Sequence, residues 1–177
     1  MADMLVKLYA LPDRQPALSL LVQQGIHIRR PHPSARDILA NWVRQRFDES
    51  WAVGCELALA SHPANCYIAV EAIQASAPPQ GPYDLPPERL LGFACYNIAS
   101  KGMFGAMGVD EAYRRRGIGT ALVLACLHAM HDEGYAYAVI GWAGSVEFYA
   151  RAVGATVIPD SEPGIFRGPL VGGEANR

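Results

Sequence analysis

A turn rich in arginine and glycine, residues 114–120 (RRRGIGT), constrains the fold of this chain more than any other feature. The apolar run at 103–109 before it predicts a strand, and the apolar residues at 118–130 after it recur with helical spacing. A helix begins with unpaired backbone N–H groups and a partial positive charge, and it therefore binds phosphate. The glycines let the backbone approach a ligand closely, and the arginines add charge and donors. The turn predicts a strand–loop–helix unit that holds a pyrophosphate.

The fixed positions of this loop are Arg114, Gly117 and Gly119, in the spacing Arg-x-x-Gly-x-Gly. No Gly-Lys-Ser/Thr follows them, which excludes a P-loop, and the full G-x-G-x-x-G pattern of a dinucleotide-binding turn is absent. The alternative interpretation is a solvated basic turn that only starts a helix.

The spacing resembles the acyl-CoA-binding loop of the GNAT family, the Gcn5-related N-acetyltransferases. A second segment, residues 147–155 (EFYARAVGA), is similar to the family's FY-x-x-x-GF signature, with one extra residue before the glycine. Its Tyr149 follows Gly117 at close to the family's usual distance. The specific resemblance covers residues 91–158, which are expected to form the acyl-CoA-binding core.

The resemblance implies that the loop binds the pyrophosphate of the cosubstrate acetyl-CoA, mainly through backbone N–H groups. The strand before it is implied to bond the pantetheine arm through the backbone of Met107 and Val109. The implied cofactor-binding residues of the loop are Arg114, Arg115, Arg116, Gly117, Ile118, Gly119 and Thr120. No metal is implied.

Tyr149 is the residue that the resemblance implies as a general acid, which protonates the leaving CoA thiolate. A phenol can give up a proton to sulfur as charge develops there, and a core aromatic on a short helix is the alternative interpretation. Glu71 is the best carboxylate candidate for a general base, although an exposed strand residue is the plainer interpretation and relayed water is an equal candidate. The family often has Asn seven residues before the tyrosine, and Trp142 stands there in this chain.

The expected activity is transfer of an acetyl group from acetyl-CoA to an amine, by direct attack and without a covalent intermediate. A non-catalytic acyl-CoA-binding or sensing module is the competing class. The acceptor is expected to be a small-molecule or peptide amine recognised by the helical region 12–60, which carries no motif that identifies it. A homodimer is left open.

The composition favours a single globular domain spanning residues 1–177. Hydrophobic residues make up 51% of the chain and charged residues 18%, which excludes a disordered chain. The net charge of −2 argues against a nucleic-acid partner. The four cysteines form no C-x-x-C pair and predict buried free thiols rather than a metal site. The chain lacks a signal-peptide pattern and an apolar run of about 18 residues, so no membrane association is expected and the predicted location is cytoplasmic.

Hydrophobic periodicity and turn residues predict a mixed α/β fold, with a mostly antiparallel sheet flanked by helices. Strands are predicted at 5–11, 66–73, 89–98, 102–109, 135–142 and 155–159, with a further short one at 165–170. Helices are predicted after residue 16 and at 35–49, 117–133 and 145–152, loops at 25–33 and 76–87, and residues 51–60 are ambiguous. The β–α–β order at 103–142 and 135–159 predicts locally parallel strands or crossovers.

Overall fold

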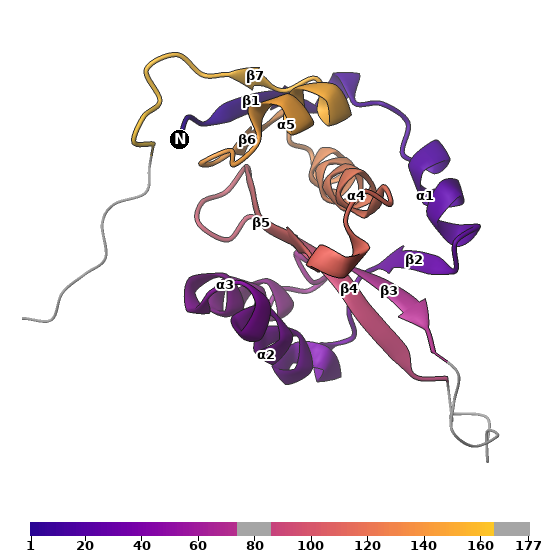
Figure 1. The fold of residues 1–177 in the computed structure, drawn as a ribbon. Helices are drawn as coiled ribbons and strands as arrows, with labels where there is room; N and C mark the ends of the chain where they lie inside the picture. The colour runs from indigo at the N-terminus through magenta and orange to yellow at the C-terminus, as the bar shows by residue number, and fades with distance from the viewer. Residues whose placement is uncertain (74–85, 165–177) are drawn as a thin grey trace, which may run out of the picture.

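The structure, a computed structural model, describes residues 1–73 and 86–164. Its strands form one mixed, mostly antiparallel sheet in the order β2-β3-β4-β5-β6-β1-β7 (Figure 1). The strands are β1 (Met4–Lys7), β2 (Ile26–Arg29), β3 (Cys66–Ala72), β4 (Glu88–Tyr96), β5 (Met103–Val109), β6 (Tyr137–Ile140) and β7 (Thr156–Val157). The helices are α1 (Gln15–Val22), α2 (Arg36–Arg46), α3 (Glu49–Leu59), α4 (Ile118–Asp132) and α5 (Val146–Val153).

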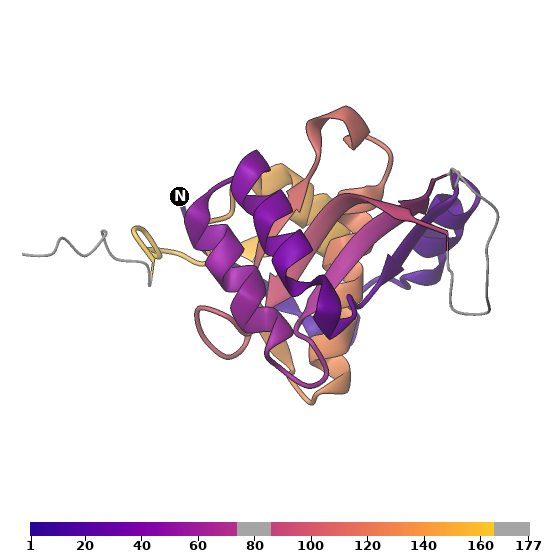
Figure 2. The same cartoon turned by 90° about the horizontal axis from the view of Figure 1, so that it is seen from below.

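Helices cover both faces of the sheet and make it the middle of three layers. α1 and α4 pack on one face, with α5 beside α4, whereas α2 and α3 form a hairpin on the other face (Figures 1 and 2). Each face buries its own apolar cluster, which includes Leu122 and Leu127 of α4 on the first face and Val43 and Cys55 of the hairpin on the second. This burial on both faces stabilises the layers.

The sheet opens between β5 and β6, the parallel strand pair that the β–α–β order predicts. The two strands pair only at Met103 with Val139 and at Phe104 with Ile140. Beyond Phe104, β5 continues to Val109 with β4 as its one strand partner among residues 1–73 and 86–164. β6 is flanked on its other side by β1, which runs antiparallel to both β6 and β7. One edge of β5 therefore stays open just before the arginine- and glycine-rich loop.

Two predicted elements near the N-terminus are wrong in part. The strand predicted at 5–11 is β1 followed by a 3-10 helix at Leu8–Ala10. The loop predicted at 25–33 contains β2, which pairs antiparallel with β3 from Ile26 opposite Glu71 to Arg29 opposite Ile68. β2 is a short edge strand with basic neighbours, so its strand conformation depends on hydrogen bonds to β3 that no local pattern shows.

The helix predicted at 35–49 is interrupted. α2 ends at Arg46, Phe47 leaves the helical conformation, and the Asp48 carboxylate accepts a hydrogen bond from the Trp51 N–H to cap α3. The ambiguous residues 51–60 belong to α3 up to Leu59, and Ala60 is its C-cap. The strand predicted at 165–170 and most of the loop at 76–87 lie outside the described residues. Within residues 1–73 and 86–164, no helix combines the length and apolar character that a membrane span requires.

Candidate functional site

The N-terminus of α4 has no capping side chain. Its N-cap residue is Gly117, whose φ of 89° lies in the left-handed region that glycine tolerates. The first backbone bond of the helix runs from the Ala121 N–H to the Gly117 carbonyl. The N–H groups of the first turn, at Ile118, Gly119 and Thr120, therefore have no partner inside the helix. This helix start can accept an anion through its backbone.

The three arginines before α4 lie in different surroundings. Arg114 donates from Nε to the Val109 carbonyl at 3.3 Å and is largely exposed. Arg115 is exposed and has a φ of 63°, which turns the chain sharply before the helix. Arg116 is half-buried, with its guanidinium 5.7 Å from the centre of the Tyr113 ring. The side chain of Arg116 is thus held within the protein, whereas Arg114 bonds a backbone carbonyl at the surface and Arg115 is exposed beside the helix start.

The open edge of β5 presents the backbone of Met107 and Val109. The Asp110 backbone N–H donates to the Leu91 carbonyl, so the backbone groups of Asp110 point towards β4. Backbone groups of successive strand residues point to alternate sides, which directs those of Val109 and Met107 towards the gap between β5 and β6. Gly119 lies close to this edge, since a Cβ placed on it would be 4.0 Å from the Met107 Cε. The first turn of α4 therefore lies beside the Met107 side chain of β5.

Tyr149 lies where β5 and β6 separate. Its ring packs edge-on against Phe104, the last residue of β5 that pairs with β6, with 6.1 Å between ring centroids. The Phe148 ring lies 4.9 Å away on the same helix. Burial raises the pKa of Tyr149 to about 12. The phenol is therefore protonated at neutral pH, and its hydroxyl forms no hydrogen bond with another described residue.

Glu71 is engaged elsewhere in the sheet. It lies on β3, which β4 separates from β5, and its carboxylate pairs with the Arg89 guanidinium at 3.0 Å. The same guanidinium donates to the Tyr113 hydroxyl at 2.7 Å. The structure brings Tyr149, Met107 and the loop to one opening, and places Glu71 in an ion pair two strands away.

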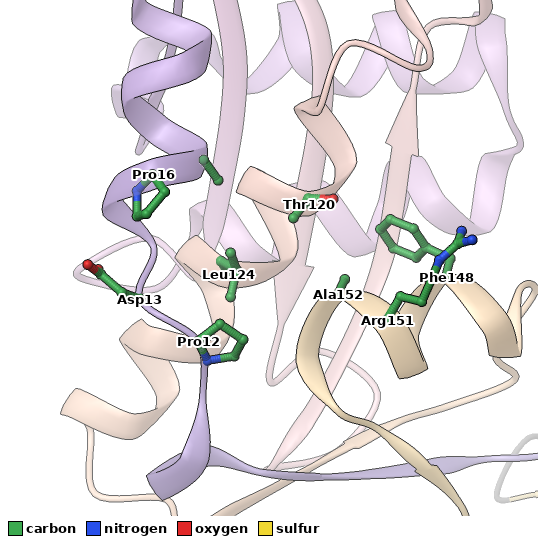
Figure 3. Close-up of a pocket in the computed structure, with 9 residues that line it drawn as sticks. Pro12, Asp13, Pro16, Thr120, Leu124, Phe148, Arg151 and Ala152 are labelled. Atoms are coloured by element: carbon green, nitrogen blue, oxygen red, sulfur yellow. The ribbon is translucent and has the colours of Figure 1, made fainter.

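Two cavities lie near the ends of the arginine- and glycine-rich loop, one among the helices α1, α4 and α5 and one at the end of α2. The first, of about 390 Å³, lies between the start of α1, α4 and α5 (Figure 3). Its lining residues are Pro12, Asp13, Pro16, Ala17, Thr120, Leu124, Phe148, Arg151 and Ala152. The second, of about 400 Å³, lies at the end of α2 and is lined by Gln45, Arg46, Phe47, Val109, Asp110, Glu111 and Arg114.

The second cavity contains contacts that sequence reasoning missed. The Arg46 Nε donates to the Asp110 carboxylate at 2.6 Å, and this hydrogen bond lowers the pKa of Asp110. The Phe47 ring lies directly on the backbone of β5, where any Cβ at Gly108 would clash with it. These pairs join residues far apart in the chain, so no local signal could have found them.

Metal ligands do not cluster in the part of the chain that the structure describes. The four cysteines are buried and unbridged, as the sequence predicts, with 3.7 Å between the sulfurs of Cys55 and Cys95.

Comparison with known proteins identifies the family. A model of the acetyltransferase (GNAT) family matches residues 36–155, more than half of the chain. A search of curated proteins found no significant relative. Among solved structures, a GCN5-related N-acetyltransferase from Sphaerobacter thermophilus is 18% identical, with a TM-score of 0.56 over 89% of this chain and 48% of that one.

A second similar structure is the GCN5-related glucosamine N-acetyltransferase region of a fungal multi-domain GH3 β-N-acetylglucosaminidase. It is 13% identical, with a TM-score of 0.66 over 89% of this chain and 19% of that one. This chain spans less than half the length of either solved chain, and these low identities support the fold alone. The predicted fold class is confirmed, and the chain belongs to the acetyltransferase (GNAT) family.

Proposed function

We propose that this protein transfers an acetyl group from acetyl-CoA to an amine. The observation that carries the proposal is the uncapped start of α4 beside the open edge of β5, in a chain of the GNAT family. The free N–H groups suit a pyrophosphate, and the edge of β5 suits an amide-containing arm that pairs with it as a strand would.

In this proposal the backbone at residues 115–120 holds the pyrophosphate, with Arg114 and Arg115 adding positive charge. Met107 and Val109 bond the pantetheine arm. The cavity shown in Figure 3 extends from Thr120 to Arg151 and offers the Phe148 ring and a guanidinium to the nucleotide end. These groups fit a polyanion joined to an aromatic base.

The chemistry requires positioning, stabilisation of an oxyanion and a proton for the leaving sulfur. A backbone N–H near Met107 to Val109 stabilises the oxyanion, and the Tyr149 hydroxyl supplies the proton for the leaving sulfur. Glu71 is a poor general base because its carboxylate already pairs with Arg89. Water relayed by backbone carbonyls at the opening is the remaining route for the proton of the amine.

Trp142 favours a second candidate, a non-catalytic acyl-CoA-binding module. Trp142 follows β6 and has a φ of 48°. Its backbone N–H donates to the carboxylate of the buried Asp3 at 2.9 Å. The loop beside the opening is thus held by a structural contact, and an indole occupies the position where the family often has an asparagine.

The two candidates are separated by turnover. Purified protein is titrated with acetyl-CoA by calorimetry and assayed for release of free CoA with a panel of amines and peptide N-termini. The acetyltransferase proposal predicts saturable binding and acceptor-dependent release. Tight binding without transfer to any acceptor would favour the binding module, and no binding would contradict both.

A further inference from the structure

Gln24, in the turn between α1 and β2, contacts the loop before α4 across 92 residues of sequence. The Arg116 Nε donates to the Gln24 Oε1 at 3.1 Å, and the Gln24 Nε2 donates to the Arg116 carbonyl at 3.4 Å. A guanidinium has no acceptor, so this pairing fixes the orientation of the carboxamide. Leu21, at the end of α1, lies below the loop, with its Cδ2 3.9 Å from a Cβ placed on Gly117.

The bond to the Arg116 carbonyl orients the next peptide N–H. In a trans peptide the C=O and N–H point in opposite directions, so a carbonyl held by Gln24 directs the Gly117 N–H away from α1. Glycine at position 117 leaves this peptide free to rotate unless a contact restrains it. The carboxamide of Gln24 provides that restraint.

The side chain of Arg116 is committed to the same contact. Its Nε bonds Gln24, and its guanidinium lies over the Tyr113 ring. Both Gln24 and Arg116 are half-buried, unlike the exposed Arg114 and Arg115. Of the three arginines, Arg116 is therefore the one whose side chain is half-buried against Gln24 and Tyr113.

We propose that Gln24 is a positioning residue for the pyrophosphate site, and that the Arg116 side chain braces the loop rather than binding phosphate. This inference rests on the proposed binding of acetyl-CoA by the same loop. Gln24 lies outside residues 36–155, so the family match does not include it. The N-terminal segment of this chain thereby sets the geometry of a site formed by the family core.

The test replaces Gln24 with a residue of similar size that cannot form either bond. Gln24→Met is expected to weaken acetyl-CoA binding about five- to tenfold, the effect of losing one to two hydrogen bonds. Gln23→Met is the matched control, because Gln23 is the adjacent residue and its side chain is exposed. The acetyl-CoA affinity of this control is expected to stay within about twofold of wild type. The KM for acetyl-CoA rises in Gln24→Met while the KM for the acceptor stays unchanged.

A double-mutant cycle tests the role of Arg116. Arg116→Met removes the bond from the guanidinium but keeps the bond from Gln24 to the Arg116 carbonyl, so it is expected to lose no more affinity than Gln24→Met. The double variant is expected to lose no more than Gln24→Met. If the Arg116 side chain bound phosphate directly, Arg116→Met would lose more, and the two losses would add. Additive losses would overturn the bracing role.

Thermal unfolding shows whether each variant is folded, and Gln24→Asn provides a second variant that keeps the amide but is too short to reach Arg116. It is expected to match Gln24→Met. Wild-type affinity in Gln24→Met or Gln24→Asn would overturn the positioning role while leaving the proposed function standing. Failure of the wild-type protein to bind acetyl-CoA would overturn the proposed function, and this inference with it.

Discussion

Helices α4 and α5 begin in opposite ways. α5 starts at Ser145, whose hydroxyl accepts a hydrogen bond from the Phe148 N–H at 3.3 Å, and has Glu147 at its second position. α4 starts at Gly117, which offers no capping side chain, and has Gly119 at its second position. The cap of α5 satisfies one of its first N–H groups and the carboxylate favours its dipole, whereas the start of α4 has neither contribution from its own side chains. In the proposed function, α4 acts through its backbone and α5 through the side chain of Tyr149.

The largest expected effect comes from placing a carboxylate at the second position of α4, where α5 has Glu147. Gly119→Glu should weaken acetyl-CoA binding about 10³-fold, because two like charges about 4 Å apart near a protein surface repel by about 4 kcal/mol. The fold should survive, since a Cβ at Gly119 meets the Phe148 ring at an ordinary 3.5 Å and a carboxylate in the first turn favours the helix. Calorimetry and thermal unfolding measure the two effects.

Two controls sharpen this comparison. Gly119→Gln has similar bulk without the charge and should lose less affinity than Gly119→Glu. Glu147→Gln removes the corresponding carboxylate from α5 and should leave acetyl-CoA affinity within about twofold of wild type. Unchanged affinity in Gly119→Glu would mean that the pyrophosphate lies elsewhere.

The next largest effect concerns the side chain that α5 contributes. Tyr149→Phe should lower kcat about 10²-fold and leave acetyl-CoA affinity nearly intact, because a general acid acts on the leaving thiolate in the transition state. Steady-state kinetics and calorimetry provide the two readouts. Wild-type kcat in the variant would identify Tyr149 as a packing residue beside Phe104.

The raised pKa of Tyr149 gives the same residue a pH signature. Because burial disfavours the phenolate, the proton is retained as pH rises through the ordinary value of 10.0 and is lost only near the folded pKa of about 12. The kcat profile should therefore show no loss centred at pH 10 in the range where the protein stays folded. A loss centred at that pH in wild type and missing from Tyr149→Phe would contradict the burial argument.

A smaller effect is expected from the exposed arginines. Arg115→Gln should weaken acetyl-CoA binding about two- to fivefold at low salt, as expected for an exposed charge pair. The difference from wild type should shrink at high ionic strength because salt screens exposed charges. A large loss that persists in high salt would indicate a buried, direct contact with phosphate.

The smallest effect on binding should come from removing the cap of α5. Ser145→Ala loses the hydrogen bond to the Phe148 N–H and should lower the free energy of unfolding by about 1 kcal/mol. Acetyl-CoA affinity should stay at the wild-type value. Chemical denaturation measures the free energy of unfolding, and calorimetry on the folded protein measures the affinity. A marked loss of affinity would show that the start of α5 also takes part in binding.

The sequence predicted the parts of the molecule that depend on local signals. The glycine spacing of the loop, the long apolar helix α4 and the Phe148-Tyr149 pair are all visible in short windows. The contacts that assemble the site are not local. Gln24 meets Arg116, and Arg46 meets Asp110, only because the sheet brings distant segments together.

The elements that sequence reasoning missed have the same cause. β2 has few residues and gains its hydrogen bonds from β3, so its pattern resembled a loop. The break between α2 and α3 lies inside a continuous apolar stripe and depends on the Asp48 cap. The cavity at the end of α2 likewise combines residues from this hairpin with residues that follow β5, so no short window of sequence shows it.

The most direct test of the comparison between the two helix starts is a titration of ¹⁵N-labelled protein with acetyl-CoA, followed by amide chemical shifts. If the uncapped start of α4 binds the pyrophosphate, the amides of Ile118, Gly119 and Thr120 should shift strongly and saturate at one equivalent of ligand. The amides of Val53 and Leu57, on the exposed side of α3, should stay unchanged. Saturable binding that leaves the first turn of α4 unshifted would contradict the account.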